Sequence, residues 1–177
     1  MEIKEILRHY PDTACLGFHD DVFNYPDDWF REFCERYQSE VKLPFWCNTR
    51  SDDVDDKVFE VLKRAGCFRV HIGIESGNSY IRRKIAGRPI SDEQIISSFQ
   101  MARSKGIKTV AFSMIGLPQE TVETITDTIN LNRKIKPDWV LCSVFNPYPG
   151  SLLYKYCDDR GIIADSPEGS YYSSRYT

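Results

Sequence analysis

Two stretches of the chain, His71-Ile-Gly-Ile-Glu-Ser-Gly-Asn78 and Phe112-Ser-Met-Ile-Gly-Leu-Pro-Gln-Glu-Thr121, decide the fold. The first is an apolar strand that ends in a carboxylate and a hydroxyl, Glu75 and Ser76. The second is an apolar strand that ends at Gly-x-Pro and enters a helix with Glu120 in its first turn. Polar residues at the carboxyl ends of buried strands are typical of parallel α/β folds, which bind ligands at that edge.

Strand and helix patterns alternate along the rest of the chain. Apolar runs predict strands at Ala14–Phe18, Pro44–Cys47, Phe68–Ile74, Ile107–Ile115 and Trp139–Phe145. Strands that alternate with helices predict right-handed βαβ units and a parallel sheet. Because a complete barrel has eight strands, five strands predict an α/β fold with a partial parallel (β/α) TIM-like barrel, or a doubly wound sheet.

Caps and breakers set the expected helix limits. The pattern Ser51-Asp52-Asp53 predicts the start of a helix that ends at Gly66, and Ser91-Asp92-Glu93-Gln94 predicts a capping box that opens a helix ended by Gly106. A last short helix is expected at Ser151–Arg160. Apolar residues at helical spacing mark the helices: Ile3, Ile6, Leu7 and Tyr10; Phe30, Phe33, Cys34 and Tyr37, after a start at Pro26-Asp27-Asp28; Val54, Val58, Val61, Leu62 and Ala65; Ile95, Phe99 and Ala102; and Val122, Ile125 and Ile129.

Composition narrows the class of protein. The chain has 177 residues, of which 41% are hydrophobic and 28% charged, which fits one globular domain with a real core. We expect a barrel domain at 1–163 and the start of a C-terminal extension or tail at 164–177, where aliphatic residues are scarce. A net charge of -3 gives no electrostatic support for binding nucleic acid or an anionic membrane. The chain has neither a signal-peptide core nor an apolar run of the roughly 20 residues that a membrane span needs, so we expect a cytoplasmic protein.

The six cysteines form no metal-binding motif. No two of them lie within four residues of each other, so there is no CxxC and no CxxxCxxC pattern. Most stand in apolar strand or helix settings, such as those of Cys15 and Cys142, where a free cysteine behaves as a small buried hydrophobe.

The two opening stretches, together with Phe18-His-Asp-Asp-Val-Phe23, resemble the radical S-adenosylmethionine (SAM) superfamily, and most closely the branch with a cobalamin-binding domain in front of its barrel. The resemblance runs from Ile3 to about Ile163 and corresponds to the second to sixth strands of that barrel. In the family, the first strand is followed by a CxxxCxxC loop that holds a 4Fe-4S cluster, and this sequence has no such loop. We therefore expect a fragment of a longer protein, in which the intact parent binds the cluster and cobalamin and this chain alone does not.

The resemblance implies contacts with SAM near the first two strands. Asp20 and Asp21 match the position that holds the methionyl ammonium of SAM, while the alternative is a turn that caps the following helix. Arg50 matches a partner for the SAM carboxylate, while the alternative is a surface ion pair with Asp52 or Asp53.

Further contacts are implied at the later strands. Glu75 and Ser76 are expected to bind the ribose or the amino group, and Ile115 and Gly116 match the stretch that lies against the adenine. Tyr148 matches the strand exit that borders the adenine side, although Asn-Pro-Tyr-Pro-Gly equally makes a rigid turn. For two histidines, His19 and His71, we expect structural roles.

The function implied is that of a radical SAM enzyme, whose intact form reductively cleaves SAM to a 5'-deoxyadenosyl radical. This chain would supply only residues that place SAM, and its substrate is not specified by the sequence. One alternative is a SAM- or nucleotide-binding module without catalysis. Another is a metal-dependent TIM-barrel lyase or transferase with Asp20, Asp21 and Glu75 as ligands. With the family's first strand missing, Ala14–Phe18 becomes an exposed sheet edge, which predicts self-association.

Overall fold

The computed structural model describes residues 2–24 and 28–163. The chain divides into two compact units, Met1–Phe145 and Asn146–Thr177. The domain limits expected from the sequence, 1–163 and 164–177, stay a prediction.

The first unit contains one parallel sheet of five strands. These are β1 (Leu16–Phe18), β2 (Phe45–Thr49), β3 (Cys67–Glu75), β4 (Lys108–Ile115) and β5 (Trp139–Val144). They lie in the order β1-β2-β3-β4-β5, so strands that are neighbours in sequence pair in space. A doubly wound sheet reverses its strand order at a switch point, whereas a barrel does not. The partial parallel barrel is therefore confirmed.

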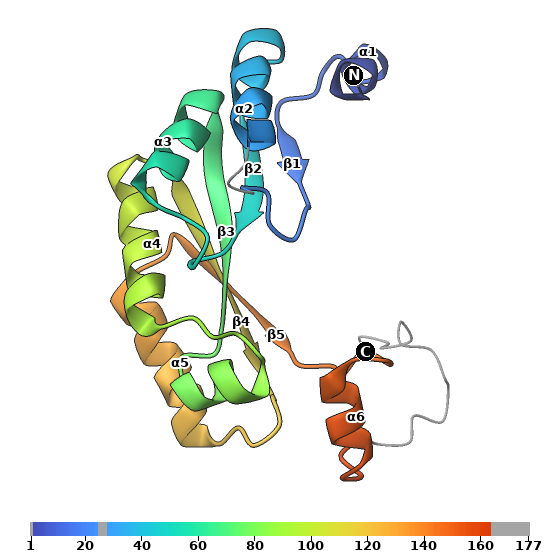
Figure 1. Ribbon diagram of the computed structural model, residues 1–177, viewed down its shortest axis with the longest axis vertical. Coiled ribbons are helices and arrows are strands. Elements are labelled where there is room, and N and C mark those ends of the chain that lie inside the picture. Colours follow the sequence, from blue (N-terminus) through green and yellow to red (C-terminus); the bar gives the residue numbers. More distant parts are fainter. Residues whose placement is uncertain (1, 25–27, 164–177) are drawn as a thin grey trace. The chain divides into compact units, whose positions relative to one another are not determined.

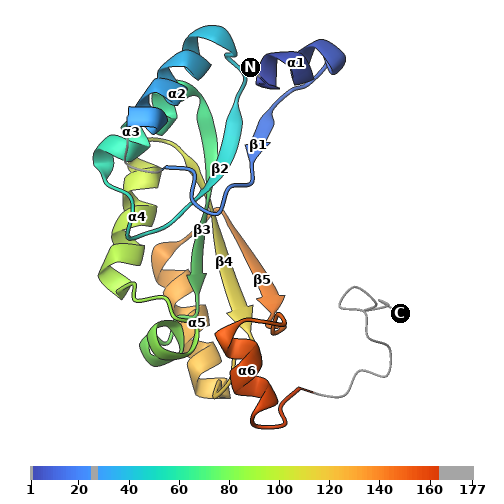
Figure 2. The ribbon, with the colours of Figure 1, turned by 45° about the vertical axis from the view of Figure 1, so that its right-hand side comes forward.

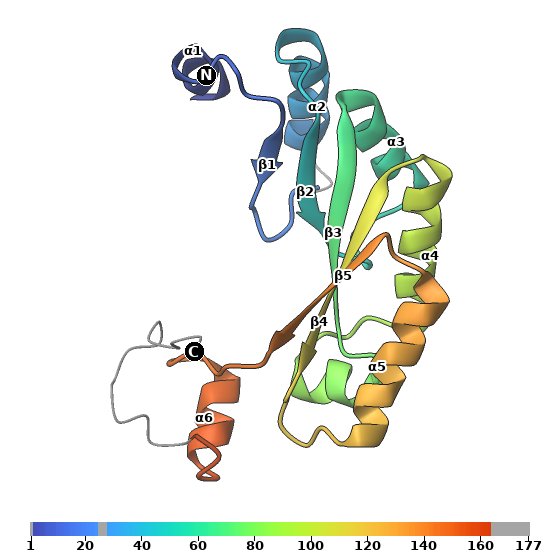
Figure 3. The same cartoon turned by 180° about the vertical axis from the view of Figure 1, so that it is seen from behind.

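Four helices cover one face of this sheet (Figure 1). They are α2 (Asp28–Glu40), α3 (Asp56–Ala65), α4 (Asp92–Ser104) and α5 (Val122–Ile135). A view from behind shows the same four helices together on one side (Figure 3). Another helix, α1 (Glu2–His9), precedes β1, and a turn of π-helix, η1 (Ile81–Ile85), follows β3 (Figure 2).

Alternation along the strands separates the two faces of the sheet. In β3, Val70, Ile72 and Ile74 are fully buried in the core beneath the helices. The residues that alternate with them, Arg69, His71 and Gly73, are half-buried and point the other way. We call the surface formed by Trp46, Arg69, His71, Gly73 and Phe112 the helix-free face.

The structure corrects two expected helix starts. Helix α3 begins at Asp56, because the carboxylate of Asp55 accepts the amide of Val58 and acts as the N-cap. Ser51 does not cap the helix, since its hydroxyl is buried 2.9 Å from that of Ser98. The start at Pro26-Asp27 lies outside the described residues.

Helix α5 begins at Val122, so Glu120 precedes the helix and does not lie in its first turn. Thr121 and Thr124 form the capping box there, and Ser91 and Gln94 form the one expected for α4. The residues of α5 that are buried are Thr128, Leu131 and Ile135, and not those whose spacing marked the helix.

Two cysteines depart from the expected burial. Cys15 and Cys142 are exposed, whereas Cys34, Cys47, Cys67 and Cys157 are buried. Cys142 lies on β5, an end strand of the sheet that is exposed along its whole length, and Cys15 lies just before the other end strand. An end strand lacks a neighbour on one side, so apolar patterning alone overestimates its burial.

The second unit contains α6 (Leu152–Asp158) among its described residues. Ser151 caps this helix, as its hydroxyl accepts the amide of Tyr154 at 3.0 Å. Across both units, no described helix is long and apolar enough to cross a membrane.

Candidate functional site

The carboxyl ends of the first four strands form one edge of the sheet, which we call the rim. It consists of the segments that follow β1, β2, β3 and β4: Asp20–Asp21, Arg50, Glu75–Gly77 and Gly116. Parallel pairing aligns the strand ends, and the register places Phe18 beside Cys47, Thr49 beside Ile72 and Glu75 beside Ser113. Residues far apart in sequence are thereby brought to one edge.

Glu75 is the most unusual residue at the rim. It adopts a left-handed backbone conformation with φ of 56°, which is uncommon for any residue except glycine. Its carboxylate folds back over Gly73. A Cβ added at Gly73 would lie only 2.8 Å from Oε1 of Glu75. Burial raises the pKa of Glu75 above 4.5, although Arg88 opposes the shift. The fold therefore holds an acceptor of elevated basicity on the helix-free side of the strand end.

Ser76 faces the opposite way and is fully buried. Its hydroxyl accepts the amide of Asn78 and lies 3.4 Å from the hydroxyl of Thr128 on α5. Thr128 also accepts the amide of Gly77 at 2.8 Å. A Cβ at Gly77 would meet the carbonyl oxygen of Asp127 at 2.3 Å, so this loop lies directly against the helix. Ser76 thus anchors the loop to α5, and the structure does not bring its hydroxyl to the side of Glu75.

A buried arginine on η1 holds the same loop from the other direction. Arg82 is 1% exposed, and its guanidinium donates to the carbonyl of Ser76 at 2.7 Å and to that of Ile90 at 2.9 Å. It also forms an ion pair with Asp92, at the start of α4. Sequence reasoning missed Arg82, because a charged residue among Ile81, Arg83 and Lys84 has the pattern of a solvated helix surface.

Two further arginines bring charge to the rim. Nε of Arg88 lies 3.5 Å from Oε1 of Glu75. Arg50 forms a two-point ion pair with Asp52, at 3.0 and 2.6 Å, and lies 3.4 Å from Asp53. Burial opposes ionisation of Asp52, yet Arg50, with a further contribution from Arg88, lowers its pKa. The surface ion pair considered for Arg50 is therefore present, and a role in binding a ligand carboxylate stays a prediction.

The aspartates after β1 are exposed and lie at the rim. The segment that carries them is fixed by Asn48, whose side-chain amide donates to the carbonyl of Asp20 at 3.0 Å and whose carbonyl accepts the amide of Phe23. The carboxylates of Asp20 and Asp21 are accessible to a ligand. Their assignment to the ammonium of SAM is not tested by this geometry.

The segment after β4 is organised around Glu120. Its carboxylate accepts the amide of Gly116 at 2.6 Å and that of Leu117 at 3.3 Å. Gly116 has φ of 82°, a conformation that favours glycine. The side chain of Ile115 lines a groove with Ile129 and other residues of α5, so it lies on the helix side of the sheet. An adenine contact at this position would involve the backbone at Gly116.

Tyr148 belongs to the second unit, where it is 63% exposed and its carbonyl accepts the amide of Ser151. Its assignment to the adenine side stays a prediction.

Below the rim, aromatic rings cross the helix-free face. The rings of Trp46 and His71 are stacked, with centroids 4.5 Å apart and an interplanar angle of 22°. His19 meets Trp46 edge-on at 4.6 Å, and Phe112 lies 5.1 Å from His71. Burial lowers the pKa of His71 to about 4, with Arg69 and His19 as further causes, so its ring is neutral at pH 7. Sequence reasoning placed His71 within a strand but did not identify this row of rings.

The cysteines do not fit a 4Fe-4S cluster. Cys34, Cys47 and Cys67 interact in the core, but burial raises the pKa of Cys34 to about 12. A hydrogen bond with Cys67, together with burial, raises the pKa of Cys47. Cluster ligands are thiolates, and the raised pKa values of Cys34 and Cys47 keep these two thiols protonated. Within 2–24 and 28–163, no group of three or more His, Cys, Asp or Glu side chains is arranged to hold a metal ion.

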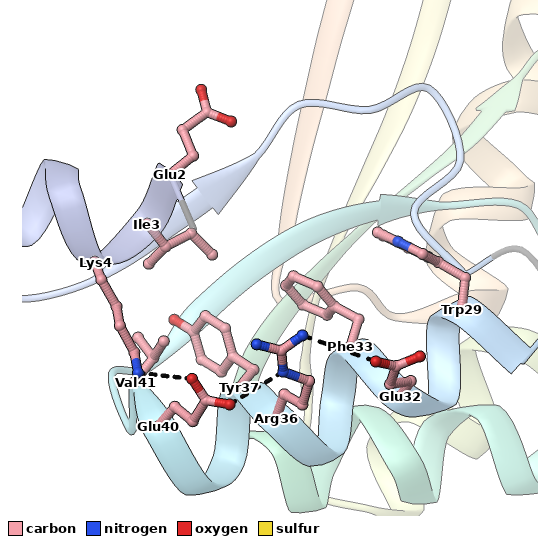
Figure 4. A pocket seen from close by; sticks show the side chains of 10 residues that line it. All are labelled: Glu2, Ile3, Lys4, Trp29, Glu32, Phe33, Arg36, Tyr37, Glu40 and Val41. Carbon is pink, nitrogen blue, oxygen red and sulfur yellow. Dashed lines mark hydrogen bonds and ion pairs between the residues drawn. The ribbon is translucent and has the colours of Figure 1, made fainter.

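A pocket of about 290 Å³ lies elsewhere, between α1 and α2 (Figure 4). Apolar side chains such as Ile3 and Phe33 line it, and the ion pairs of Glu40 with Lys4 and Arg36 border it. The hydroxyl of Tyr37 is buried without a hydrogen-bond partner in the described part of the chain. The pocket includes no residue of the rim.

Comparisons with known proteins agree with this architecture. An uncharacterized methyltransferase of Pyrococcus horikoshii is 29% identical over 92% of this chain, and the anaerobic magnesium-protoporphyrin IX monomethyl ester cyclase of Rubrivivax gelatinosus is 28% identical over 91%. The chain spans only 36% and 29% of the lengths of these two relatives.

Solved structures show the same fold. The radical SAM methyltransferase TsrM of Kitasatospora setae, with cobalamin and a 4Fe-4S cluster bound, matches 90% of this chain and 30% of its own, with a TM-score of 0.77 and 16% identity. Coproporphyrinogen III oxidase of Escherichia coli, a radical SAM enzyme, matches 82% of this chain and 36% of its own, with a TM-score of 0.68 and 17% identity.

The family model of the radical SAM superfamily matches residues 2–131, which include β1 to β4 and every residue of the rim. Its match, together with the parallel strand order and the structural likenesses, leads to one conclusion: this chain belongs to the radical SAM superfamily.

Proposed function

We propose that the rim binds the methionyl and ribose parts of SAM, and that this chain is the SAM-placing part of a larger radical SAM enzyme of the cobalamin-associated branch. The observation that carries the proposal is Glu75, a largely buried carboxylate in a left-handed conformation at the carboxyl end of a parallel strand. Strained backbone tends to persist where the surrounding structure enforces it and function uses it.

The charges at the rim suit a zwitterion. In the chain alone, Arg88 and Glu75 approach each other at 3.5 Å, which is longer than a good charge-assisted hydrogen bond. An α-amino acid group would place its ammonium on Glu75 and its carboxylate on Arg88. Glu75 and Arg88 would then each have a charged partner closer than the 3.5 Å that separates them in the chain alone. Binding of the ammonium would also favour the ionised form of Glu75, whose burial disfavours it.

The anchors around Glu75 explain how the chain holds the backbone beside the carboxylate still. Arg82 fixes the carbonyl of Ser76, and Thr128 fixes the amide of Gly77. Because the peptide unit between Ser76 and Gly77 is held at both its carbonyl and its amide, the backbone next to Glu75 is fixed before a ligand arrives. Such preorganisation lowers the entropy cost of binding.

When bound to reduced 4Fe-4S in an intact radical SAM enzyme, SAM supplies a 5'-deoxyadenosyl radical. The chain has no CxxxCxxC pattern to supply the thiolates of such a cluster, and its own part in this chemistry would be to bind and orient SAM. The relatives' names point to methyl transfer and cyclisation as reaction types of the complete protein. Its substrate and product are not assigned by the rim.

Equilibrium dialysis with labelled SAM tests the proposal. We expect weak binding by the full 177-residue chain and about tenfold weaker binding by Glu75→Gln, because the variant loses a charge-assisted hydrogen bond. Glu60→Gln, which changes an exposed carboxylate on α3, is the matched control and should bind as the parent chain does. Equal affinity of the parent chain and Glu75→Gln would remove Glu75 from the site.

A further inference from the structure

The helix-free face carries a cluster of aromatic and cationic side chains that the proposed SAM site does not use. Its members are Trp46 on β2, Arg69 and His71 on β3, Phe112 on β4 and also Trp139 on β5, whose ring lies within reach of the Arg69 guanidinium. They come from four adjacent strands, and the cluster therefore extends across most of the sheet.

The rings of Trp46 and His71 are stacked face to face, with an interplanar angle of 22°, so their edges point away from the sheet. Trp46 and His71 are separated by 4.5 Å, close to the spacing of about 4.8 Å between neighbouring strands. Two rings that are stacked at that spacing on neighbouring strands have their planes roughly perpendicular to the sheet. On its other side, the indole of Trp46 covers Gly17, where a Cβ would meet the ring at 2.3 Å. Ring edges carry partial positive charge, so the surface attracts the electron-rich face of a conjugated ring.

Arg69 adds a full positive charge next to these rings. Its guanidinium carbon lies 5.6 Å from the ring centre of Trp46 and 6.0 Å from that of Trp139, both within cation–π range. Its Nε is buried without a hydrogen-bond partner in the described part of the chain. None of the ion pairs formed by described residues involves Arg69.

The neighbouring charges do not neutralise Arg69. Lys108, which pairs with Arg69 in the strand register, is itself cationic and is bound to Asp138 at 2.7 Å. His71 is neutral at pH 7, since its pKa is lowered to about 4. Among residues 2–24 and 28–163, the half-buried guanidinium thus has no carboxylate partner, and an anionic group on a ligand would supply one.

We propose that this cluster binds a flat conjugated molecule that carries a carboxylate. The conjugated part lies across the outward edges of Trp46 and His71, and the carboxylate binds Arg69. Gly73, beneath the carboxylate of Glu75, is the next residue on the same face after His71, so the ligand's other end reaches toward the rim. The statement that such a molecule is the substrate of the complete enzyme rests on the proposed function. The statement that the cluster binds such a molecule does not.

The test compares two probes of the same shape, naphthalene-2-carboxylate and naphthalene-2-carboxamide, on the full chain without SAM. Binding is followed by the indole N–H signals of Trp29, Trp46 and Trp139 in ¹⁵N NMR spectra. We expect the carboxylate to bind about tenfold more tightly than the amide, since it gains a charge-assisted bond from Arg69. We also expect the signal of Trp46 to shift and that of Trp29, on α2, to stay unchanged.

Variants separate the two contacts. Arg69→Gln should abolish the preference for the carboxylate, Arg69→Lys should retain part of it, and Trp46→Leu should weaken both probes. Arg83→Gln removes an exposed charge from η1 and should change nothing. Equal binding of the two probes, an unshifted Trp46 signal or an unchanged preference in Arg69→Gln would overturn the proposal. Because SAM is absent, these results do not depend on the dialysis experiment with Glu75→Gln.

Discussion

At the scale of single residues, the rim shows which features of a residue a strand pattern predicts and which it does not. Glu75 and Ser76 were placed at a strand end from the sequence, and they lie there. The alternation of side chains along a strand does not predict the directions of these two side chains, because the left-handed conformation of Glu75 interrupts the alternation. Glu75 therefore folds over Gly73, whereas Ser76 is directed to α5. Arg82, which donates to the carbonyl of Ser76, has no periodic signal in the sequence.

The buried guanidinium of Arg82 stabilises the loop after β3. Replacement by methionine leaves the carbonyls of Ser76 and Ile90 without that donor, and an unsatisfied buried group costs about 1–3 kcal/mol. We expect Arg82→Met to lower the free energy of unfolding by about 2–4 kcal/mol, as measured by urea denaturation. Arg83→Met, at the exposed neighbouring position, should change it by less than about 0.5 kcal/mol. A similar small effect of both variants would show that the anchor contributes little.

His71 makes stability depend on pH. Its pKa is lowered in the folded state from 6.5 to about 4, so the unfolded chain binds the proton more readily. The contribution of neutral His71 to the free energy of unfolding is complete above pH 6.5 and is lost as the pH falls toward 4. We expect His71→Gln to flatten the decline of the melting temperature across this interval. An imidazole NMR titration of His71 with a midpoint near 6.5 would contradict this assignment.

At the scale of elements, the strands and most helices follow from the sequence, whereas the strand order, which separates a partial barrel from a doubly wound sheet, and the helix starts do not. The start of α3 is set by Asp55, because the preceding polar residues are engaged by Arg50 and Ser98. Glu120 reads as a first-turn residue of α5, yet it accepts the amides of Gly116 and Leu117. A side chain that is expected to cap a helix can instead bind a residue distant in sequence. Such tertiary contacts cannot be identified from one sequence.

The contact between the loop after β3 and α5 gives a prediction at this scale. Gly77→Ala would place a Cβ 2.3 Å from the backbone of Asp127, and overpacking of this kind costs about 1–3 kcal/mol. Gly87→Ala is the comparison, since Gly87 has φ of 66° but no atom within 4 Å of an added Cβ. We expect Gly77→Ala also to weaken SAM binding, while Gly87→Ala retains it. Unchanged SAM affinity in a folded Gly77→Ala variant would contradict the role of this contact.

At the scale of the whole first unit, both end strands of the sheet are open to association. The sequence identified Ala14–Phe18, of which Leu16 and Phe18 are half-buried. It predicted a strand at Trp139–Phe145 but did not identify this strand, β5, as an exposed edge, where Trp139, Leu141 and Val144 are each more than half exposed. Exposed apolar end strands favour pairing with another chain. Light scattering should detect dimers or larger species, and Val144→Lys should reduce them if β5 contributes. A monomeric parent chain would contradict self-association through either edge.

The central claim is that the carboxyl edge of this sheet places SAM, and NMR mapping tests it most directly. Titration of the ¹⁵N-labelled chain with SAM should shift the amides of Asp21, Glu75, Gly77 and Gly116 in a concentration-dependent way. Amides at the opposite ends of the strands, such as Phe45 and Lys108, should stay in place. Shifts confined to those opposite ends, or to the pocket between α1 and α2, would contradict the account.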